Sequence, residues 1–155
     1  MIHEVIGDLL TSGADVICHQ VNYHGVMGGG IAASIREKML SPKRYAAYVM
    51  HCQRLGRNAL GTVLFTPTCT EKGIVANLFS QDDFTTDYDA LRSCLKYVEK
   101  AARIMNWTVA LPGNMGCGIA HGDWDEVFKV IQEVFGESPV ELTIVYWYAD
   151  QADKL

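Results

Sequence analysis

The sequence predicts an α/β domain in layers, and three observations carry that prediction. Short β-branched runs alternate with longer helical patterns along the chain. The strand-like runs are mostly apolar, as expected of strands covered on both faces. With 155 residues, of which 49% are apolar, the chain has the length of one domain with its own core. We therefore expect a single domain over residues 1–155.

Six segments are expected to form strands. They are residues 2–6, 16–21, 62–66, 74–79, 108–111 and 142–148, all short and mostly apolar. No internal repeat or low-complexity segment interrupts the alternation, and the last residues, 150–155, are expected to form a frayed polar tail.

Four helices are expected between these strands. The most regular has apolar residues three and four positions apart, at Tyr88, Leu91, Leu95, Val98, Ala102 and Met105. A second begins at Trp124 with Asp123 as its N-cap, and its apolar face is Trp124, Val127, Phe128, Ile131, Val134 and Phe135. The other two run from Gly30 to about Met39 and from Pro42 to about Leu55, the latter with Tyr45, Tyr48, Val49 and Cys52 on its buried side.

Charge and composition exclude several classes of protein. The chain has 13 Lys and Arg against 18 Asp and Glu, a net charge of −5, which argues against a broad nucleic-acid-binding surface. The basic residues Lys43, Arg44, Arg54 and Arg57 are expected to form a solvated helix face. No leader pattern and no apolar run near the ~20 residues of a membrane span is present, so we expect a cytoplasmic protein without membrane contact. The five cysteines are odd in number and form no C-x-x-C pair, which predicts neither disulfides nor a zinc site.

A glycine-rich loop follows the strand predicted at 16–21. It reads Asn22-Tyr23-His24-Gly25-Val26-Met27-Gly28-Gly29-Gly30 and leads directly into a helix. Glycine allows the backbone to approach a ligand closely, and the exposed amides at a helix N-terminus attract phosphate without any lysine. A flexible turn that happens to be rich in glycine is the alternative for one such loop.

A second glycine-rich loop follows the strand predicted at 108–111. It reads Pro112-Gly113-Asn114-Met115-Gly116-Cys117-Gly118-Ile119-Ala120-His121-Gly122 and again leads into a helix. In an open α/β sheet both loops would lie at the carboxyl ends of their strands, where ligands bind. Two amide-rich loops on one edge indicate a site for a diphosphate.

Other phosphate-binding patterns fit poorly. The chain has no G-x-x-x-x-G-K-[ST] sequence, which argues against ATP hydrolysis. Gly28, Gly30 and Ala33 satisfy G-x-G-x-x-A, but six residues separate Gly28 from the strand. An NAD-dependent oxidoreductase is therefore kept only as a remote alternative.

Four segments together resemble the macrodomain family of ADP-ribose-binding modules. They are Gly7-Asp8-Leu9-Leu10, His19-Gln20-Val21-Asn22 through Met27 to Ala32, Val75 through Gln81, and Pro112 through Gly118 with Trp124. The pattern is similar to the branch containing ADP-ribose 1''-phosphate phosphatases and the hydrolases that remove ADP-ribose from glutamate or nucleobases. The resemblance implies a three-layer α/β/α sandwich around a mixed, mostly parallel six-stranded sheet, with ADP-ribose across the strand ends and neither metal nor cofactor.

The resemblance also implies which residues touch the ligand. The Asp8 carboxylate would accept a hydrogen bond from the adenine amino group, and the Leu9 amide would contact the ring. Asn22 would hold the distal ribose hydroxyls, while Phe79, Ser80 and Gln81 would flank the adenosine. Amides of two sets of residues would bind the phosphates: Gly28, Gly29, Gly30 and Ile31, and Met115, Gly116, Cys117, Gly118, Ile119 and Ala120. From the residues alone, Asp8 is equally a turn residue, Asn22 a loop cap and Phe79 a core residue.

The sequence departs from the glutamate-ADP-ribose hydrolases of this branch at two positions. It has no lysine in residues 61–67, and Ala120 stands where the aspartate after the G-C-G turn would be. Activation of water would then fall to His24 or His121, because histidine titrates near neutral pH, with Asn22 holding the ribose. His19 is expected to be structural, Cys117 to fill a turn, and the acidic residues Asp82, Asp83 and Asp87 to cap a helix or face solvent.

Two functions remain open at this stage. The first is a hydrolase that removes a group from the distal ribose of ADP-ribose, with the phosphatase type most compatible with Asn22, His24 and the absent lysine. The second is a non-catalytic module that binds free, protein-linked or nucleic-acid-linked ADP-ribose.

Overall fold

A mixed six-stranded sheet forms the centre of the computed structural model, which describes residues 1–70 and 73–148. The strand order is β1-β8-β7-β2-β4-β3, and every neighbouring pair is parallel except β3 with β4. The strands are β1 (Ile2–Gly7), β2 (Val16–Val21), β3 (Val63–Pro67), β4 (Ile74–Phe79), β7 (Val109–Pro112) and β8 (Leu142–Trp147). All six predicted strands are confirmed, with small shifts at their ends.

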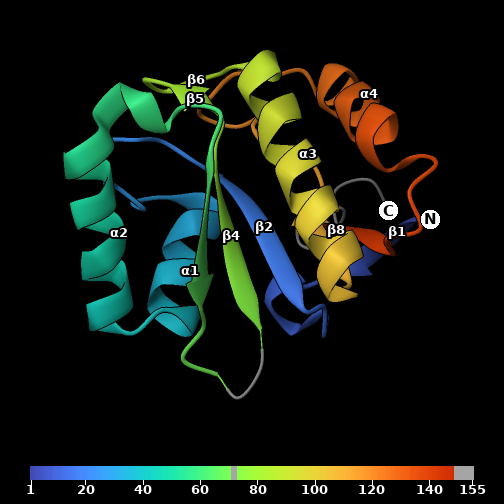
Figure 1. Cartoon of the computed structure of the whole chain (residues 1–155), viewed down its shortest axis with the longest axis horizontal. Coiled ribbons are helices and arrows are strands. Elements are labelled where there is room, and N and C mark those ends of the chain that lie inside the picture. The colour runs from blue at the N-terminus through green and yellow to red at the C-terminus, as the bar shows by residue number, and fades with distance from the viewer. Residues whose placement is uncertain (71–72, 149–155) are drawn as a thin grey trace.

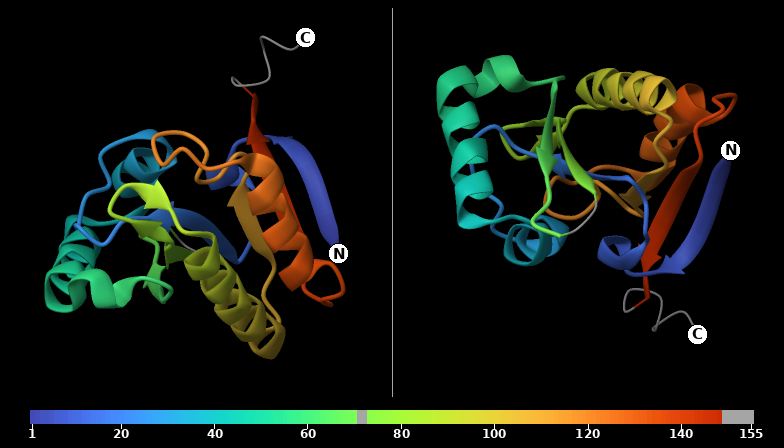
Figure 2. Two further views of the ribbon diagram at one scale, coloured as in Figure 1. Left: turned by 90° about the horizontal axis from the view of Figure 1, so that it is seen from above. Right: turned by 60° about the horizontal axis from the view of Figure 1, so that its bottom comes forward.

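Two pairs of helices cover the two faces of the sheet (Figures 1 and 2). α1 (Gly30–Met39) and α2 (Pro42–Leu55) lie on one face, and α3 (Tyr88–Met105) and α4 (Trp124–Phe135) on the other. Successive side chains of β2 point to opposite faces of the sheet. Cys18 packs into the core beneath α3 and α4, and Ile17 packs into the core beneath α1 and α2. The predicted three-layer sandwich and its helices are confirmed.

The helices differ in how their first amides are satisfied. Side-chain oxygens cap α2, α3 and α4, from Ser41, Asp87 and Asp123 respectively. The predicted N-cap at Asp123 is thus confirmed, with its carboxylate accepting from the Asp125 amide. α1 follows Gly29, which has no side chain to cap it. The first amides of α1 are therefore left open to a ligand or to water.

Two expectations about burial are wrong. β1 is not covered on both faces, because it is an edge strand beyond the helices, and Val5 and Ile6 are 44% and 61% exposed (Figure 2). Met105 lies in the last turn of α3 and is 57% exposed, although the apolar periodicity placed it on the buried face. On α2, Tyr48 and Cys52 are buried as expected, while Tyr45 and Val49 are half-buried.

A small hairpin between β4 and α3 was not predicted. β5 (Gln81–Asp82) pairs antiparallel with β6 (Thr85–Thr86), and a turn through Asp83 and Phe84 joins them. Two 3₁₀ helices, η1 (Leu9–Thr11) and η2 (Gly56–Ala59), were not predicted either. Within the described residues, no helix has the length and apolar character needed to cross a membrane. The tail expected at 150–155 lies outside the described residues.

Candidate functional site

The two glycine-rich loops leave the same edge of the sheet and face each other. β2 and β7 are adjacent and parallel, with Val16 opposite Val109, so the chain leaves both strands at their common carboxyl edge. A Cβ placed on Gly29 in the first loop would lie 3.8 Å from Cδ1 of Ile119 in the second. The structure therefore brings the two loops together as the sequence predicted.

Both loops present backbone amides without protein partners. In the first loop the amides of Gly28, Gly29, Gly30 and Ile31 donate to no other described residue. In the second loop the same holds for Met115, Gly116, Gly118, Ile119 and Ala120. Because unpaired amides of this kind attract anions, the arrangement suits a phosphate or diphosphate group.

The second loop is held in shape by its own hydrogen bonds. The amide of Cys117 donates to Asn114, that of His121 to Gly118, and that of Gly122 to Gly116 at 2.7 Å. Glycine is required at the last contact, since a Cβ on Gly122 would stand 2.4 Å from the Gly116 carbonyl oxygen. The loop is thus preorganised rather than flexible.

A buried chain of hydrogen bonds connects β2 and β4 to this loop. The Ser80 hydroxyl donates to the Gln20 side chain at 2.8 Å, and Gln20 Nε2 donates to Thr86 Oγ1 at 2.9 Å. Thr86 then donates to the Gly116 carbonyl at 2.8 Å. Ser80 and Phe79 are both fully buried, so the structure does not bring either side chain to the ligand side of the loops. Ser80 instead supports the second loop from the protein interior, through the hydrogen bonds of Gln20 and Thr86.

The hairpin also contacts the first loop, through His24. Nε2 of His24 lies 3.2 Å from a carboxylate oxygen of Asp83, and its ring stacks on Phe84 with centroids 5.1 Å apart. The expectation that the acidic residues cap a helix or face solvent is confirmed for Asp87, which caps α3, and for Asp83, whose side chain is 77% exposed although it also contacts His24. Strands of two residues are too short to give a periodic signal, and only the Asp-Asp-Phe turn followed by two threonines pointed to a hairpin.

Tyr23 and Arg57 hold the other aspartate of the hairpin. The Tyr23 hydroxyl donates to Asp82 at 2.7 Å, and the guanidinium of Arg57 donates to both oxygens of the same carboxylate, at 3.2 and 2.8 Å. These hydrogen bonds, chiefly those from Arg57, lower the pKa of Asp82 to about 2. Asp82 is therefore charged throughout the neutral range.

Asn22 and Asp8 both make local hydrogen bonds. Asn22 Oδ1 accepts from the His24 amide at 2.9 Å, and Nδ2 donates to the Val26 carbonyl at 3.1 Å. One Asp8 oxygen accepts from the Leu10 amide at 2.9 Å and caps η1. Both side chains thus shape their loops, as the interpretation from residue chemistry alone allowed.

Simpler roles fall to His19, His121 and Cys117. His19 is fully buried with Nε2 2.7 Å from the Asn77 side-chain oxygen, which confirms its structural role. His121 is exposed, and its side chain forms no hydrogen bond, ion pair or aromatic contact with another described residue. Burial raises the pKa of the Cys117 thiol, which disfavours the thiolate and agrees with a turn-filling role.

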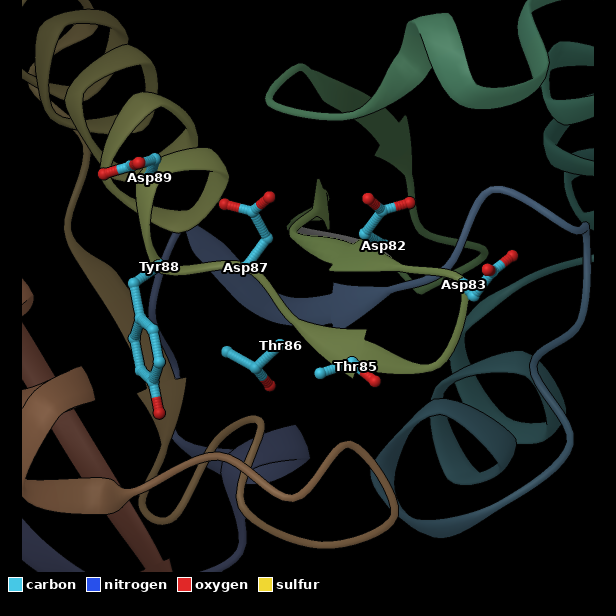
Figure 3. A pocket seen from close by; sticks show the side chains of 7 residues that line it. All are labelled: Asp82, Asp83, Thr85, Thr86, Asp87, Tyr88 and Asp89. Atoms are coloured by element: carbon cyan, nitrogen blue, oxygen red, sulfur yellow. The ribbon is translucent and has the colours of Figure 1, made fainter.

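A hollow of about 470 Å³ lies beside the hairpin and the start of α3 (Figure 3). It is lined by four carboxylates, those of Asp82, Asp83, Asp87 and Asp89, together with Thr85, Thr86 and Tyr88. Carboxylates repel phosphate, so the diphosphate is expected at the glycine-rich loops and not in this hollow.

The sequence also matches the model of the Macro domain family, over residues 18–131. The chain belongs to the macrodomain family. It is 38% identical over 87 residues to an ADP-ribose 1''-phosphate phosphatase from Candida albicans, covering 53% of this chain and 54% of that protein. A phosphatase of the same name from Scheffersomyces stipitis is 40% identical over 77 residues, covering 44% and 43%. This macrodomain thus aligns with about half the length of these curated relatives.

Solved structures agree on the fold. The macrodomain of Mycobacterium tuberculosis DarG superposes with a TM-score of 0.81 and 26% identity, covering 94% of this chain and 97% of that one. The resemblance inferred from the four sequence segments is thereby confirmed.

Proposed function

We propose that this macrodomain binds ADP-ribose across its two glycine-rich loops and hydrolyses a group attached to the distal ribose. The observation that carries the proposal is the pair of facing loops with unpaired amides at one sheet edge. ADP-ribose has a diphosphate between two ribose rings, which matches two amide clusters with further contacts on either side. The relatives named as ADP-ribose 1''-phosphate phosphatases support the same substrate class.

The strand order suggests how the ligand lies. β1, β8, β7 and β2 are parallel neighbours, so the loops that follow β1, β7 and β2 lie along one edge in that order. Adenine would then sit near Asp8 and Leu9, the diphosphate between the glycine-rich loops, and the distal ribose near Asn22 and His24. The Asp8 oxygen that does not cap η1 is left to accept from the adenine amino group.

His24 is the candidate general base. With Asp83 accepting from Nε2–H, Nδ1 is the nitrogen that no other described residue engages. It can take a proton from water as the water oxygen attacks the phosphorus of a 1''-phosphate. The bond between phosphorus and the ribose oxygen then breaks and that oxygen takes up a proton, giving ADP-ribose and inorganic phosphate. Asn22 would position the ribose hydroxyls, and His121, which lacks an orienting partner, is the weaker candidate.

The binding proposal is tested by a thermal-shift titration with ADP-ribose, AMP, NAD and ATP. A ligand present at about 100 times its dissociation constant adds about 2.7 kcal/mol to the folded state. ADP-ribose should stabilise the protein well beyond AMP, NAD or ATP. A preference for NAD would instead favour the oxidoreductase alternative, and no shift with ADP-ribose would contradict the proposed site.

Catalysis is tested by comparing His24→Ala with His121→Ala. Removing a general base lowers kcat by about 10²–10⁴-fold, so we expect that loss in His24→Ala with little change in the dissociation constant of ADP-ribose. His121→Ala should retain most of the activity. The parent protein could bind ADP-ribose and yet release nothing from ADP-ribose linked to phosphate, protein or nucleic acid. In that case it is a non-catalytic ADP-ribose-binding module and not an enzyme.

A cytoplasmic location is part of the same proposal. All five cysteines are free, and Cys18, Cys52 and Cys94 are buried as small apolar side chains. Unpaired cysteines in these numbers fit a reducing compartment.

A further inference from the structure

The side chain of His24 contacts both the loop that carries it and the turn of the hairpin. Its ring contacts two aromatic rings, with the Tyr23 centroid at 4.7 Å and the Phe84 centroid at 5.1 Å. Asp83 meets its Nε2 at 3.2 Å. Three neighbours therefore fix the orientation of the imidazole, and two of them belong to the hairpin turn.

The hydrogen bond between His24 and Asp83 is too weak to keep the two side chains in place without other contacts. The two side chains are 39% and 77% exposed, and an ion pair with this exposure contributes little to stability because water and salt screen it. Asp83 also has a φ of +53°, in the left-handed region that residues other than glycine rarely adopt. Some other group must keep the turn in the conformation that presents Asp83 and Phe84 to His24.

The Tyr23 hydroxyl is one such group, beside the Arg57 guanidinium that also binds Asp82. It accepts a hydrogen bond from the Asp83 amide at 3.0 Å and donates one to the Asp82 carboxylate at 2.7 Å. One oxygen thus fixes both residues at the start of the turn, from a tyrosine that is only 8% exposed and packs into the core beneath α1 and α2. Tyr23 therefore connects a rigid part of the fold to an exposed turn.

We propose that Tyr23 is a positioning residue for catalysis, which holds the hairpin turn so that Asp83 and Phe84 orient the imidazole of His24. The inference rests on the proposed hydrolase function, since it assigns His24 the role of base. Tyr23 itself does not touch the substrate, because its hydroxyl is engaged by the hairpin. Its effect passes through Asp83 and Phe84.

The test is Tyr23→Phe, which keeps the aromatic ring and removes only the hydroxyl. We expect kcat on ADP-ribose 1''-phosphate to fall about tenfold, a part of the full general-base contribution, with KM within about twofold. In the NMR spectrum of the free protein, the His24 ring protons should lose the ring-current shift that Phe84 contributes. The ring at residue 23 is retained, so a change in these signals reports release of the hairpin.

Tyr45→Phe is the matched control. The Tyr45 hydroxyl donates to the Gly25 carbonyl at 3.1 Å, so it holds the same loop without touching the hairpin. It should leave both kcat and the His24 signals as in the parent. Equal effects of the two variants, or no effect of Tyr23→Phe on either readout, would overturn the inference.

A second variant and the spectra separate this inference from the proposed function. Asp83→Asn alters an exposed side chain, keeps the fold and the Phe84 stack, and should lower kcat as Tyr23→Phe does. Full activity of Asp83→Asn would count against the inference while the hydrolase stands. If the parent protein shows no turnover at all, the proposed enzyme fails, and the His24 signals of Tyr23→Phe still decide whether Tyr23 holds the turn.

Discussion

A buried, neutral histidine connects the stability of this macrodomain to pH at the level of one residue. His19 is fully buried, its Nε2 contacts Asn77, and its Nδ1 has no partner among the described residues. Burial lowers the pKa of His19 from 6.5 to about 4, outweighing the opposite effect of the hydrogen bond that His19 donates to the Asn77 side-chain oxygen. The unfolded chain therefore binds a proton at a higher pH than the folded chain does.

The sign of the resulting pH dependence follows from that difference. As the pH falls from about 6.5 to about 4, the unfolded state gains the proton first, and the free energy of unfolding decreases by up to about 1.4 kcal/mol per pH unit. His19→Gln should remove this part of the pH dependence. Urea unfolding of both proteins at about pH 7 and about pH 4.5 measures it. The same loss on acidification in both proteins would show that His19 does not cause it.

The second glycine-rich loop has room for an added methyl group at one glycine and none at another. A Cβ on Gly122 would stand 2.4 Å from the Gly116 carbonyl, whereas a Cβ on Gly118 would meet nothing within 4 Å. Gly122→Ala should therefore cost about 1–3 kcal/mol of stability and weaken ADP-ribose binding by disturbing the loop. Gly118→Ala keeps its amide and should leave stability nearly unchanged. Unfolding midpoints of the two variants give the comparison, and equal midpoints would contradict the steric argument.

Elements of this protein were predictable from sequence to different degrees, for physical reasons. The four helices show in the sequence because burial of one helix face imposes a period of 3.6 residues, and the six strands show because strands of a sheet covered by helices are short, mostly apolar runs. The facing loops followed from the parallel order of β2 and β7. The hairpin β5–β6 could not be predicted, because its strands have two residues each and its contact with His24 joins positions far apart in the chain. Asp83 and Tyr23 were missed as site residues for that reason.

Charge is unevenly distributed over the whole molecule. Residues 36–57 contain six of the 13 lysines and arginines and only one of the 18 acidic residues, so this span carries +5 and the rest of the chain −10. The basic span covers all of α2 and the end of α1, while the four-carboxylate hollow is lined in part by Asp83, which contacts His24. A group leaving the distal ribose would thus meet a negative field.

This field predicts a preference among conjugates of ADP-ribose. Nucleic-acid-linked ADP-ribose carries a row of phosphates past the acidic hollow, so its kcat/KM at low salt should lie well below that of ADP-ribose 1''-phosphate. Repulsion weakens as the Debye length shrinks, from about 30 Å at 0.01 M to about 10 Å at 0.1 M, so the difference should narrow with added salt. Kinetics on both substrates across this range measure it. A kcat/KM for the nucleic-acid conjugate that falls with salt would instead mean that the basic span of α1 and α2 attracts the strand and outweighs the hollow.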